Sequence, residues 1–237
     1  MFGVGLSTVM VNLYELVSAI NKAFTIKFPE SHSDQLKIAK GFERRSSVGF
    51  DCVAGCIDGL IVWIEQPLQR DCDLLKCGQR RFYCERKSKF GFNMQAICDY
   101  NGRFLEVWIG NPASSSDFIS FIRSSMYEKL SKPDFLAKGL VIFGDNAYTN
   151  GDFMVSPYKG AKVGIKDDFN FFHSQVRITI ERAFGMLVQR FGLLRRAMSQ
   201  HIPAKKEMAI VLACCKLQEQ QFHRDWIIHK FNGETNA

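Results

Sequence analysis

Apolar residues recur every three or four positions in several stretches of the chain, a spacing that predicts amphipathic helices. The repeat is clearest over residues 173–194. The expected helices cover residues 6–24, Ser114–Leu130, residues 173–194 and Ala204–Phe222. Residues 28–50 contain Pro29 and a polar segment, so they predict a connector with one short helix near Gln35–Gly41.

Shorter apolar runs, bounded by turn residues, predict strands. These runs are Val53–Ile57, Leu60–Ile64, Phe92–Cys98, Phe104–Ile109 and Leu140–Phe143. Asp58-Gly59 is expected to be the turn of a hairpin or a bulge between the first two, and Asn101-Gly102 a hairpin turn between the next two. The last run lies between Gly139 and Gly144, which is typical of a buried parallel strand.

The order of these elements predicts the fold class. Four strands, a helix, a further strand and two helices fit an α/β protein with a curled mixed sheet flanked by helices. The polar and basic residues 66–81 are expected to form a loop. Neither a low-complexity tract nor an internal repeat interrupts this order.

The charge of the chain favours a polyanionic partner. The 237 residues carry a net charge of +7, and the sequence pI is near 9.0. Residues 76–90 hold six Lys/Arg and one acid, and residues 171–237 hold ten Lys/Arg and five acids. Either cluster could be an ordinary solvated face, but together with the acidic residues described next they favour contact with nucleic acid.

The eight cysteines are expected to be free thiols in a reducing compartment. The start of the chain, Met1–Leu6, lacks the basic residues of a secretory signal. The cysteines form no Cys-x-x-Cys pair and have no His nearby, which argues against zinc. No apolar stretch is long enough to span a membrane, so no membrane association is expected.

Three acidic residues, Asp58, Asp145 and Glu181, stand in contexts suited to holding a metal ion. The two aspartates follow apolar runs, and Glu181 lies beside the apolar stripe of a predicted helix. Buried carboxylates repel one another unless a cation compensates them. Hard oxygen ligands suit Mg²⁺ or Mn²⁺, and two such ions can clamp the attacking and leaving oxygens of a phosphodiester. The triplet therefore predicts metal-assisted cleavage of a nucleic acid.

Each acid also has a plain structural interpretation. Asp58 could belong to a turn, Asp145 could cap the next helix, and Glu181 could pair with Arg177 one helical turn earlier. Asp117, a fourth acid at an expected helix start, is better explained as a helix cap than as a support for the metal site.

Five segments carry a resemblance to a known family. They are Gly55–Gly59, Asn93–Asp99, Gly144–Tyr148, Ile180–Gly185 and Arg190–Leu194. Over roughly residues 1–222 the chain resembles the PIF/Harbinger transposases of the DDE superfamily, which include the domesticated Harbinger transposase-derived nucleases. The chain departs from the family pattern at Pro112–Asp117, which lacks the usual His, and at Thr149, where the family has proline.

The resemblance implies an RNase H-like fold and a divalent-metal nuclease with Asp58, Asp145 and Glu181 as catalytic triad and metal ligands. It also implies DNA as substrate, action in the nucleus and a separate Myb-like DNA-binding partner; self-association is a further expectation. It divides the chain into residues 1–47, the truncated remnant of a helix-turn-helix, residues 48–222, the DDE nuclease domain, and residues 223–237, a tail. The expected phosphate contacts are Arg81, Arg86, Lys87, Lys89, Arg177, Arg182 and Arg190.

Two other functions remain open from the sequence. A domesticated or decayed relative would bind DNA or a protein partner without cleaving. A small-molecule metal hydrolase such as a phosphatase would have a compact pocket, and the basic clusters speak against it.

Overall fold

The computed structural model describes residues 5–234, and for Leu6, Gln221, His223 and residues 225–234 it describes the backbone alone. The helices are α1 Leu6–Ala23, α2 His32–Arg45, α3 Gln69–Leu74, α4 Asp117–Ile122, α5 Ser125–Leu130, α6 Ile165–Arg190 and α7 Ala204–Glu234. The strands are β1 Val53–Ile64, β2 Tyr83–Cys84, β3 Lys89–Cys98, β4 Phe104–Pro112, β5 Val141–Phe143 and β6 Met154–Val155. Short 3₁₀ turns are η1 Gln79–Phe82, η2 Glu85–Lys87 and η3 Gly192–Arg195.

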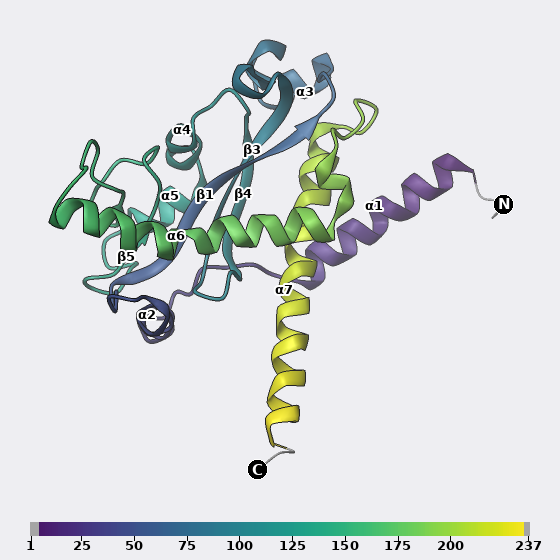
Figure 1. Cartoon of the computed structure of the whole chain (residues 1–237). Coiled ribbons are helices and arrows are strands. Elements are labelled where there is room, and N and C mark those ends of the chain that lie inside the picture. Colours follow the sequence, from purple (N-terminus) through teal and green to yellow (C-terminus); the bar gives the residue numbers. More distant parts are fainter. Residues whose placement is uncertain (1–4, 235–237) are drawn as a thin grey trace.

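A mixed sheet forms the centre of the molecule (Figure 1). β3 pairs antiparallel with β1 on one side and with β4 on the other, and β2 pairs with the start of β3. β5 pairs parallel with β1, and β6 pairs parallel with β5. The predicted α/β class with a mixed sheet flanked by helices is confirmed, and the strand arrangement is consistent with an RNase H-like fold.

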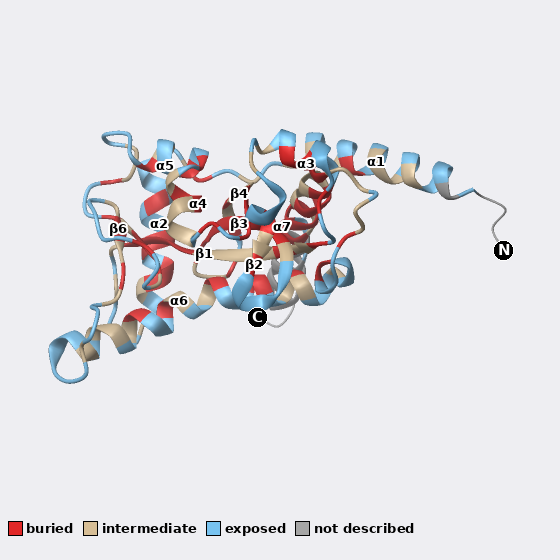
Figure 2. Cartoon of the chain, turned by 90° about the horizontal axis from the view of Figure 1, so that it is seen from above, coloured by how far each residue is buried: buried red, intermediate tan, exposed pale blue. Residues whose placement is uncertain are grey.

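Each face of the sheet packs against its own helices. On one face, Cys56 of β1 and Met94 of β3 pack with Val176 and Ile180 of α6 and with residues of α7. On the other face, Ile57 and Ile97 pack with Phe121 of α4 and Met126 of α5. The burial map shows the sheet enclosed between these layers (Figure 2).

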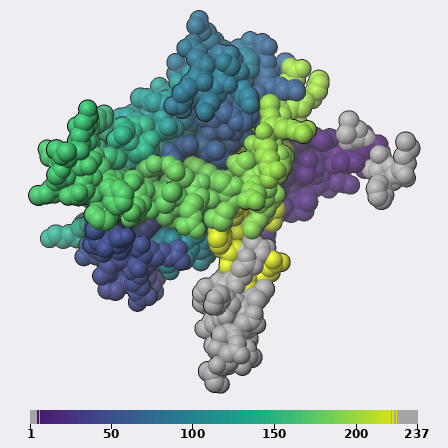
Figure 3. Space-filling model, viewed as in Figure 1, coloured from purple at the N-terminus to yellow at the C-terminus, as the bar shows by residue number. Residues whose placement is uncertain are grey.

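Helix α1 extends from the body of the molecule and contacts α7 at its base (Figure 3). Asn21 of α1 donates a hydrogen bond to the carbonyl of Ala209, and Lys216 donates one to the carbonyl of Asn21. The helices within residues 5–234 include none with the length and apolarity that a membrane crossing requires. The eight cysteines are free thiols, as predicted.

The predicted β3–β4 hairpin and the parallel strand over Leu140–Phe143 are confirmed. The Asp99 carboxylate accepts hydrogen bonds from the backbone of Asn101 and Arg103, and Gly102 adopts a φ of 84° that favours glycine. These contacts fix the turn that the Asn-Gly pair predicts.

The predicted turn at Asp58-Gly59 is wrong, because β1 runs unbroken through both residues. The partners of Asp58 and Gly59 on β3 are Ala96 and Gln95, so the hydrogen-bond ladder continues where the turn was expected. An Asp-Gly pair stands in mid-strand here because the glycine allows a close approach from another element.

Three helix predictions also need correction. Ser114–Leu130 is not one helix but two, α4 and α5, because Ser124 breaks the first and caps the second by accepting the N–H of Tyr127. Helix α6 begins at Ile165 rather than residue 173, and α7 continues beyond Phe222 to Glu234.

The expected loop over residues 66–81 contains α3 and η1, and residues 235–237 of the expected tail lie outside the described residues.

The start of α7 contains a buried acid, Glu207, which is 3% exposed. Burial, and next the neighbouring charge of Asp71, raise its pKa to about 8. Asp71 is itself buried, and its carboxylate accepts the backbone N–H groups of Leu68 and Ala204, which joins α3 to the start of α7. An ionised Glu207 therefore works against the packing of these two helices.

We expect Glu207→Gln to change how stability depends on pH. The pKa of Glu207 is higher in the folded protein than its ordinary value of 4.5, so the wild type loses stability as pH rises from about 4.5 to about 8. The variant should lack this loss and be more stable than the wild type by about 1–3 kcal/mol at pH 8.5. Urea unfolding at pH 5 and pH 8.5 measures this difference in the free energy of unfolding. Asp73→Asn, which changes an exposed acid, is the control. The same pH dependence of stability in the wild type and in Glu207→Gln would contradict the prediction.

Candidate functional site

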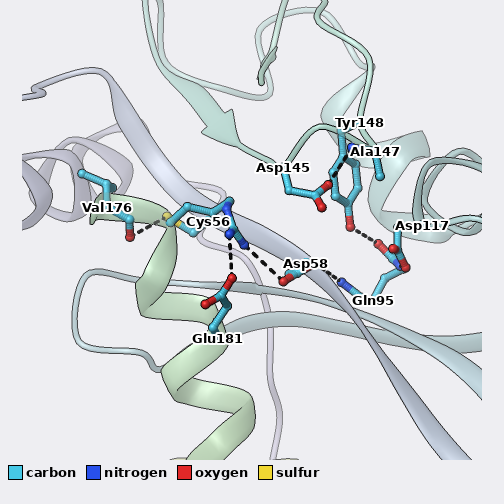
Figure 4. A network of polar contacts seen from close by, with 11 residues as sticks. Cys56, Asp58, Gln95, Asp117, Asp145, Ala147, Tyr148, Val176 and Glu181 are labelled. Carbon is cyan, nitrogen blue, oxygen red and sulfur yellow. Dashed lines mark hydrogen bonds and ion pairs between the residues drawn. The ribbon is translucent and has the colours of Figure 1, made fainter. Parts of the chain in front are cut away.

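The pairing of β1 with β5 brings Asp58, in the middle of β1, level with Asp145, two residues beyond the end of β5. Cys56 lies opposite Phe143 in this parallel pair, and each acid follows two residues later. The Oδ1 atom of Asp145 accepts the backbone N–H of Ala147 at 2.8 Å, which orients the carboxylate just beyond the strand. Figure 4 shows the Asp145 carboxylate just after its strand and the Asp58 carboxylate on a strand that continues past it.

Asp58 is strongly perturbed by its surroundings. Burial raises its pKa to about 7, the backbone N–H of Gly59 opposes this rise, and the charge of Asp145 adds to it. Arg177 lowers the pKa and Asp117 raises it, by smaller amounts. A carboxylate in such surroundings ionises readily only when a cation is close.

Arg177 connects Asp58 to Glu181. Its guanidinium lies 3.4 Å from Oδ2 of Asp58 and 2.6 Å from Oε1 of Glu181, which stands one turn later on α6. The side chain of Arg177 is 18% exposed, while that of Glu181 is 47% exposed. The i, i+4 pairing considered as an alternative for Glu181 is thus present, and the same arginine also reaches β1.

The described residues contain no group of three or more His, Cys, Asp or Glu side chains already placed to hold a metal ion. Asp58 and Asp145 supply the hard oxygen donors that Mg²⁺ or Mn²⁺ requires, on adjacent strands. Glu181 could join them only after releasing Arg177. The donor chemistry therefore fits a divalent ion. In this structure the cation that lies among these carboxylates is Arg177.

Asp117 approaches the same strands from the other face of the sheet. Asp58 and Gly59 are consecutive in β1, so their Cα substituents point to opposite faces. If Gly59 carried a Cβ atom, that atom would lie 1.9 Å from Oδ1 of Asp117 and 2.8 Å from Nε2 of Gln95. Glycine at this position thus makes room for the Asp117 carboxylate.

The expected capping role of Asp117 is wrong. Ser116 is the N-cap of α4, and its hydroxyl accepts the N–H of Ile119. The Asp117 carboxylate instead accepts side-chain hydrogen bonds from Asn93 at 2.9 Å and from Gln95 at 3.2 Å. Its position in the first turn of α4 still favours a negative charge.

A buried polar network that sequence analysis missed surrounds Asp117. The hydroxyl of Tyr148 donates to Oε1 of Gln95 at 2.6 Å (Figure 4), and Nε2 of Gln95 donates to Oδ1 of Asn93 at 2.7 Å. Tyr148, Gln95 and Asn93 are each at most 2% exposed. Two polar residues at alternate positions of an otherwise apolar strand were the available clue.

His173 is a second feature that sequence analysis missed. It is fully buried, its ring stacks on Phe143 with 4.4 Å between centroids, and burial lowers its pKa to about 4. His173, Arg177 and Glu181 follow at intervals of four residues on α6 and so lie along one side of the helix. The neutral imidazole packs the start of this side against the end of β5.

The predicted phosphate contacts are spread over several places. Arg81 and Arg86 line a groove that also contains Asp117, whereas Arg177 is held by the two carboxylates. Lys89 lies over the ring of Trp63, and the remaining residues of the set, Lys87, Arg182 and Arg190, are exposed.

The fold and this site define an α/β protein with one aspartate in the middle of β1, a second just beyond the end of the neighbouring β5, and a glutamate on the helix packed against them. The model of the family described as DDE superfamily endonuclease matches residues 57–219. This chain belongs to that family, whose nucleases generally use divalent metal ions.

Two kinds of curated relative match the chain. "Putative nuclease HARBI1" of Bos taurus is 26% identical over 171 residues, 71% of this chain and 46% of the relative, and that of Homo sapiens matches equally. "Protein ALP1-like" of Arabidopsis thaliana is 23% identical over 231 residues, 91% of this chain and 53% of the relative. The chain thus spans about half the length of these relatives, and no solved structure matches it.

We expect Gly59→Ala to destabilise the protein because its Cβ atom would displace Asp117 and Gln95 from their hydrogen bonds. The free energy of unfolding should fall by about 1–3 kcal/mol. Gly185→Ala is the matched control: Gly185 is exposed on α6, a Cβ atom there meets nothing within 4 Å, and stability should stay equal or rise by up to about 1 kcal/mol. Equal denaturant midpoints for the two variants would refute the close approach of Asp117.

Proposed function

We propose that this chain is a divalent-metal-dependent DNA endonuclease of transposase-derived type, with Asp58, Asp145 and Glu181 as its catalytic carboxylates. The observation that carries this proposal is the β1–β5 register, which sets Asp58, in the middle of β1, level with Asp145, just beyond the end of β5. The membership of the DDE endonuclease family and the nuclease names of the HARBI1 relatives support the same chemistry.

Asp58 and Asp145 would share a bound Mg²⁺ or Mn²⁺, and Glu181 would complete a second position. Such ions supply a water of lowered pKa and stabilise the leaving oxygen of a phosphodiester. The chain's own part is to hold the ligands in place. The N–H of Ala147 fixes Asp145, the N–H of Gly59 fixes Asp58, and α6 carries Glu181 to the strand end.

Arg177 has a separate role in this proposal. In the protein without metal, its guanidinium pairs with both Asp58 and Glu181. Asp58, whose pKa is raised by burial, therefore has a cation beside it when it is ionised. If Glu181 were to bind a metal ion, Arg177 would be available for the phosphate to be cut.

DNA is proposed as the substrate, with the exposed basic residues positioning its backbone without reading its sequence. Those residues include Arg182 and Arg190 on α6, Lys87 in η2 and Lys89 at the start of β3. We also propose that the protein acts in the nucleus, that a Myb-like protein supplies sequence-specific binding, and that copies of the chain self-associate.

One observation favours a second function, binding of DNA or a protein partner without cleavage. Within the described residues the carboxylates do not form a ready metal cluster, and Arg177 already neutralises two of them. A relative that had lost cleavage would keep such an internally compensated site. Mg²⁺-dependent cutting of DNA separates the two functions.

Asp145→Asn tests the proposed function. The amide keeps an oxygen that can accept the Ala147 N–H, but it removes the charge that would hold the metal ion. Cleavage of labelled duplex DNA in Mg²⁺ should fall by at least about 100-fold, while DNA affinity changes less than about twofold. Asp152→Asn, an exposed acid in the same loop region, should cut like the wild type. Undiminished cutting by Asp145→Asn would rule out the assignment.

Arg177→Gln should strengthen metal binding in the absence of DNA. Without the guanidinium, Asp58 and Glu181 lose the cation that they share and gain affinity for a divalent ion, by roughly tenfold or more for Mn²⁺. Electron paramagnetic resonance of a Mn²⁺ titration measures this without any cleavage. Arg182→Gln carries the same charge change on an exposed neighbour, and it should bind Mn²⁺ like the wild type; equal or weaker binding by Arg177→Gln contradicts the competition.

A further inference from the structure

A groove of about 680 Å³ lies beside the candidate site, on the face of the sheet that carries α4. Gly59 of β1, Asn93 of β3 and Asp117 of α4 are among the residues that line it. Asn93 pairs with Ile61 and Gln95 with Gly59, so this part of the lining belongs to the same stretch of β1 and β3 that holds the polar network. The groove therefore begins one residue from Asp58 and also reaches Ala147, two residues from Asp145.

Two chain segments form the walls of the groove, and hydrogen bonds tie them together. One wall comes from η1, β2 and η2, and the other from residues 113–116 before α4. The N–H of Ser114 donates to the carbonyl of Arg81 at 3.0 Å, and the side chain of Asn93 donates to the carbonyl of Ser115 at 3.4 Å. The groove is thus a formed feature of the fold rather than a gap between loose segments.

The wall formed by η1, β2 and η2 is strongly basic. Arg80, Arg81 and Arg86 all line the groove and are exposed. Arg80 has a carboxylate partner, Glu85, at 3.6 Å in an exposed pair, whereas Arg81 and Arg86 have no ion pair within residues 5–234. Guanidinium groups in such a position suit phosphate oxygens because they can donate two hydrogen bonds in parallel.

The opposite wall offers hydroxyl groups, and one of them is without a partner. Ser115 lines the groove and is 6% exposed, yet its hydroxyl makes no hydrogen bond among the described residues. Buried hydroxyl groups in native proteins normally have a partner. The Ser115 hydroxyl is closed to solvent in this structure, so it must turn toward the groove before a phosphate oxygen seated there can accept its hydrogen bond.

We infer that this groove holds the sugar-phosphate backbone of the DNA strand on one side of the phosphate to be cut. Arginines on one wall and serines on the other suit a chain of phosphates, and Gly59 and Ala147 in the lining put the groove next to Asp58 and close to Asp145 along the chain. This inference rests on the proposed function, because it takes DNA as the substrate.

The first experiment measures binding rather than cleavage. A fluorescein-labelled single strand of about 15 nucleotides is titrated in Ca²⁺-free, Mg²⁺-free buffer over a series of salt concentrations. The triple variant Arg80→Gln, Arg81→Gln, Arg86→Gln should bind about tenfold or more weakly. Its plot of log affinity against log salt should flatten by about 0.7 for each phosphate that the variant no longer neutralises.

A second triple variant provides the matched control. Lys37→Gln, Lys40→Gln, Arg44→Gln removes the same charge from α2, which lies at the other end of the molecule from α3 and α4 (Figure 1). It should bind within about twofold of the wild type at about 0.15 M salt, where distant charges are screened. Equal reductions of affinity in the two triple variants, or unchanged affinity in the groove variant, would overturn the inference.

Ser115→Ala tests the groove without changing charge. Both Ser115 and Ser120 are buried serines whose hydroxyls lack partners among the described residues, but only Ser115 lines the groove. Neither Ser115→Ala nor Ser120→Ala should lower thermal stability, and only Ser115→Ala should weaken strand binding, by roughly 3–10-fold. Equal affinities for these two variants would count against the groove.

The outcomes also separate this inference from the proposed function. If Asp145→Asn abolishes cleavage but the groove variants bind like the wild type, the DNA-binding role of the groove is refuted and the proposed nuclease function is kept. If the groove variants bind more weakly but the wild type never cuts in Mg²⁺ or Mn²⁺, the DNA-binding role of the groove is kept and the proposed nuclease function is refuted.

Discussion

The parallel pairing of β5 with β1 is the constraint on which the site depends. β5 is only three residues long, Val141–Phe143, yet its register against Val53–Cys56 decides which residue of β1 lies level with the chain that leaves β5. Cys56 lies opposite Phe143, so Asp145, two residues after β5 ends, comes level with Asp58, two residues further along β1, without any direct bond between them. A shift of this short strand by one residue would turn its side chains to the other face and separate the two acids.

The sheet also divides the polar groups between its faces. Asp58 points to the α6 side, where Arg177 meets it, while Gly59 opens the α4 side to Asp117 and its network with Gln95 and Asn93. Burial of so many polar groups is tolerable because nearly every member has a hydrogen-bond partner. As a result, Arg177 and the Gly59 N–H hold Asp58, and Asn93 and Gln95 hold Asp117. These contacts keep the two carboxylates from moving apart.

Much of this fold follows from local patterns, and the rest depends on contacts between distant segments. The hairpin at Asn101-Gly102 and the strand at Leu140–Phe143 were predictable because turn residues and apolar runs are local features. Asp58-Gly59 misled the prediction because an Asp-Gly pair usually makes a turn, whereas here the glycine admits Asp117 from a distant part of the chain. The three acids could be chosen from their sequence context, but the double pairing of Arg177 could not, since only the packing of α6 on β1 brings that arginine to Asp58.

Arg177 explains how such an acidic site can fold without a metal ion. Removing one partner of a partly buried ion pair is costly, and Asp58 already has a raised pKa while Arg177 is present. A single guanidinium that pairs with both Asp58 and Glu181 lowers this cost, and it holds α6 close to Asp58 on β1. The same contact sets a condition on the proposed chemistry: Glu181, which is the more exposed of the two acids, is the one that can leave Arg177 with less loss of burial. The fold thus assigns the fixed position to Asp58 and the movable one to the glutamate on the helix.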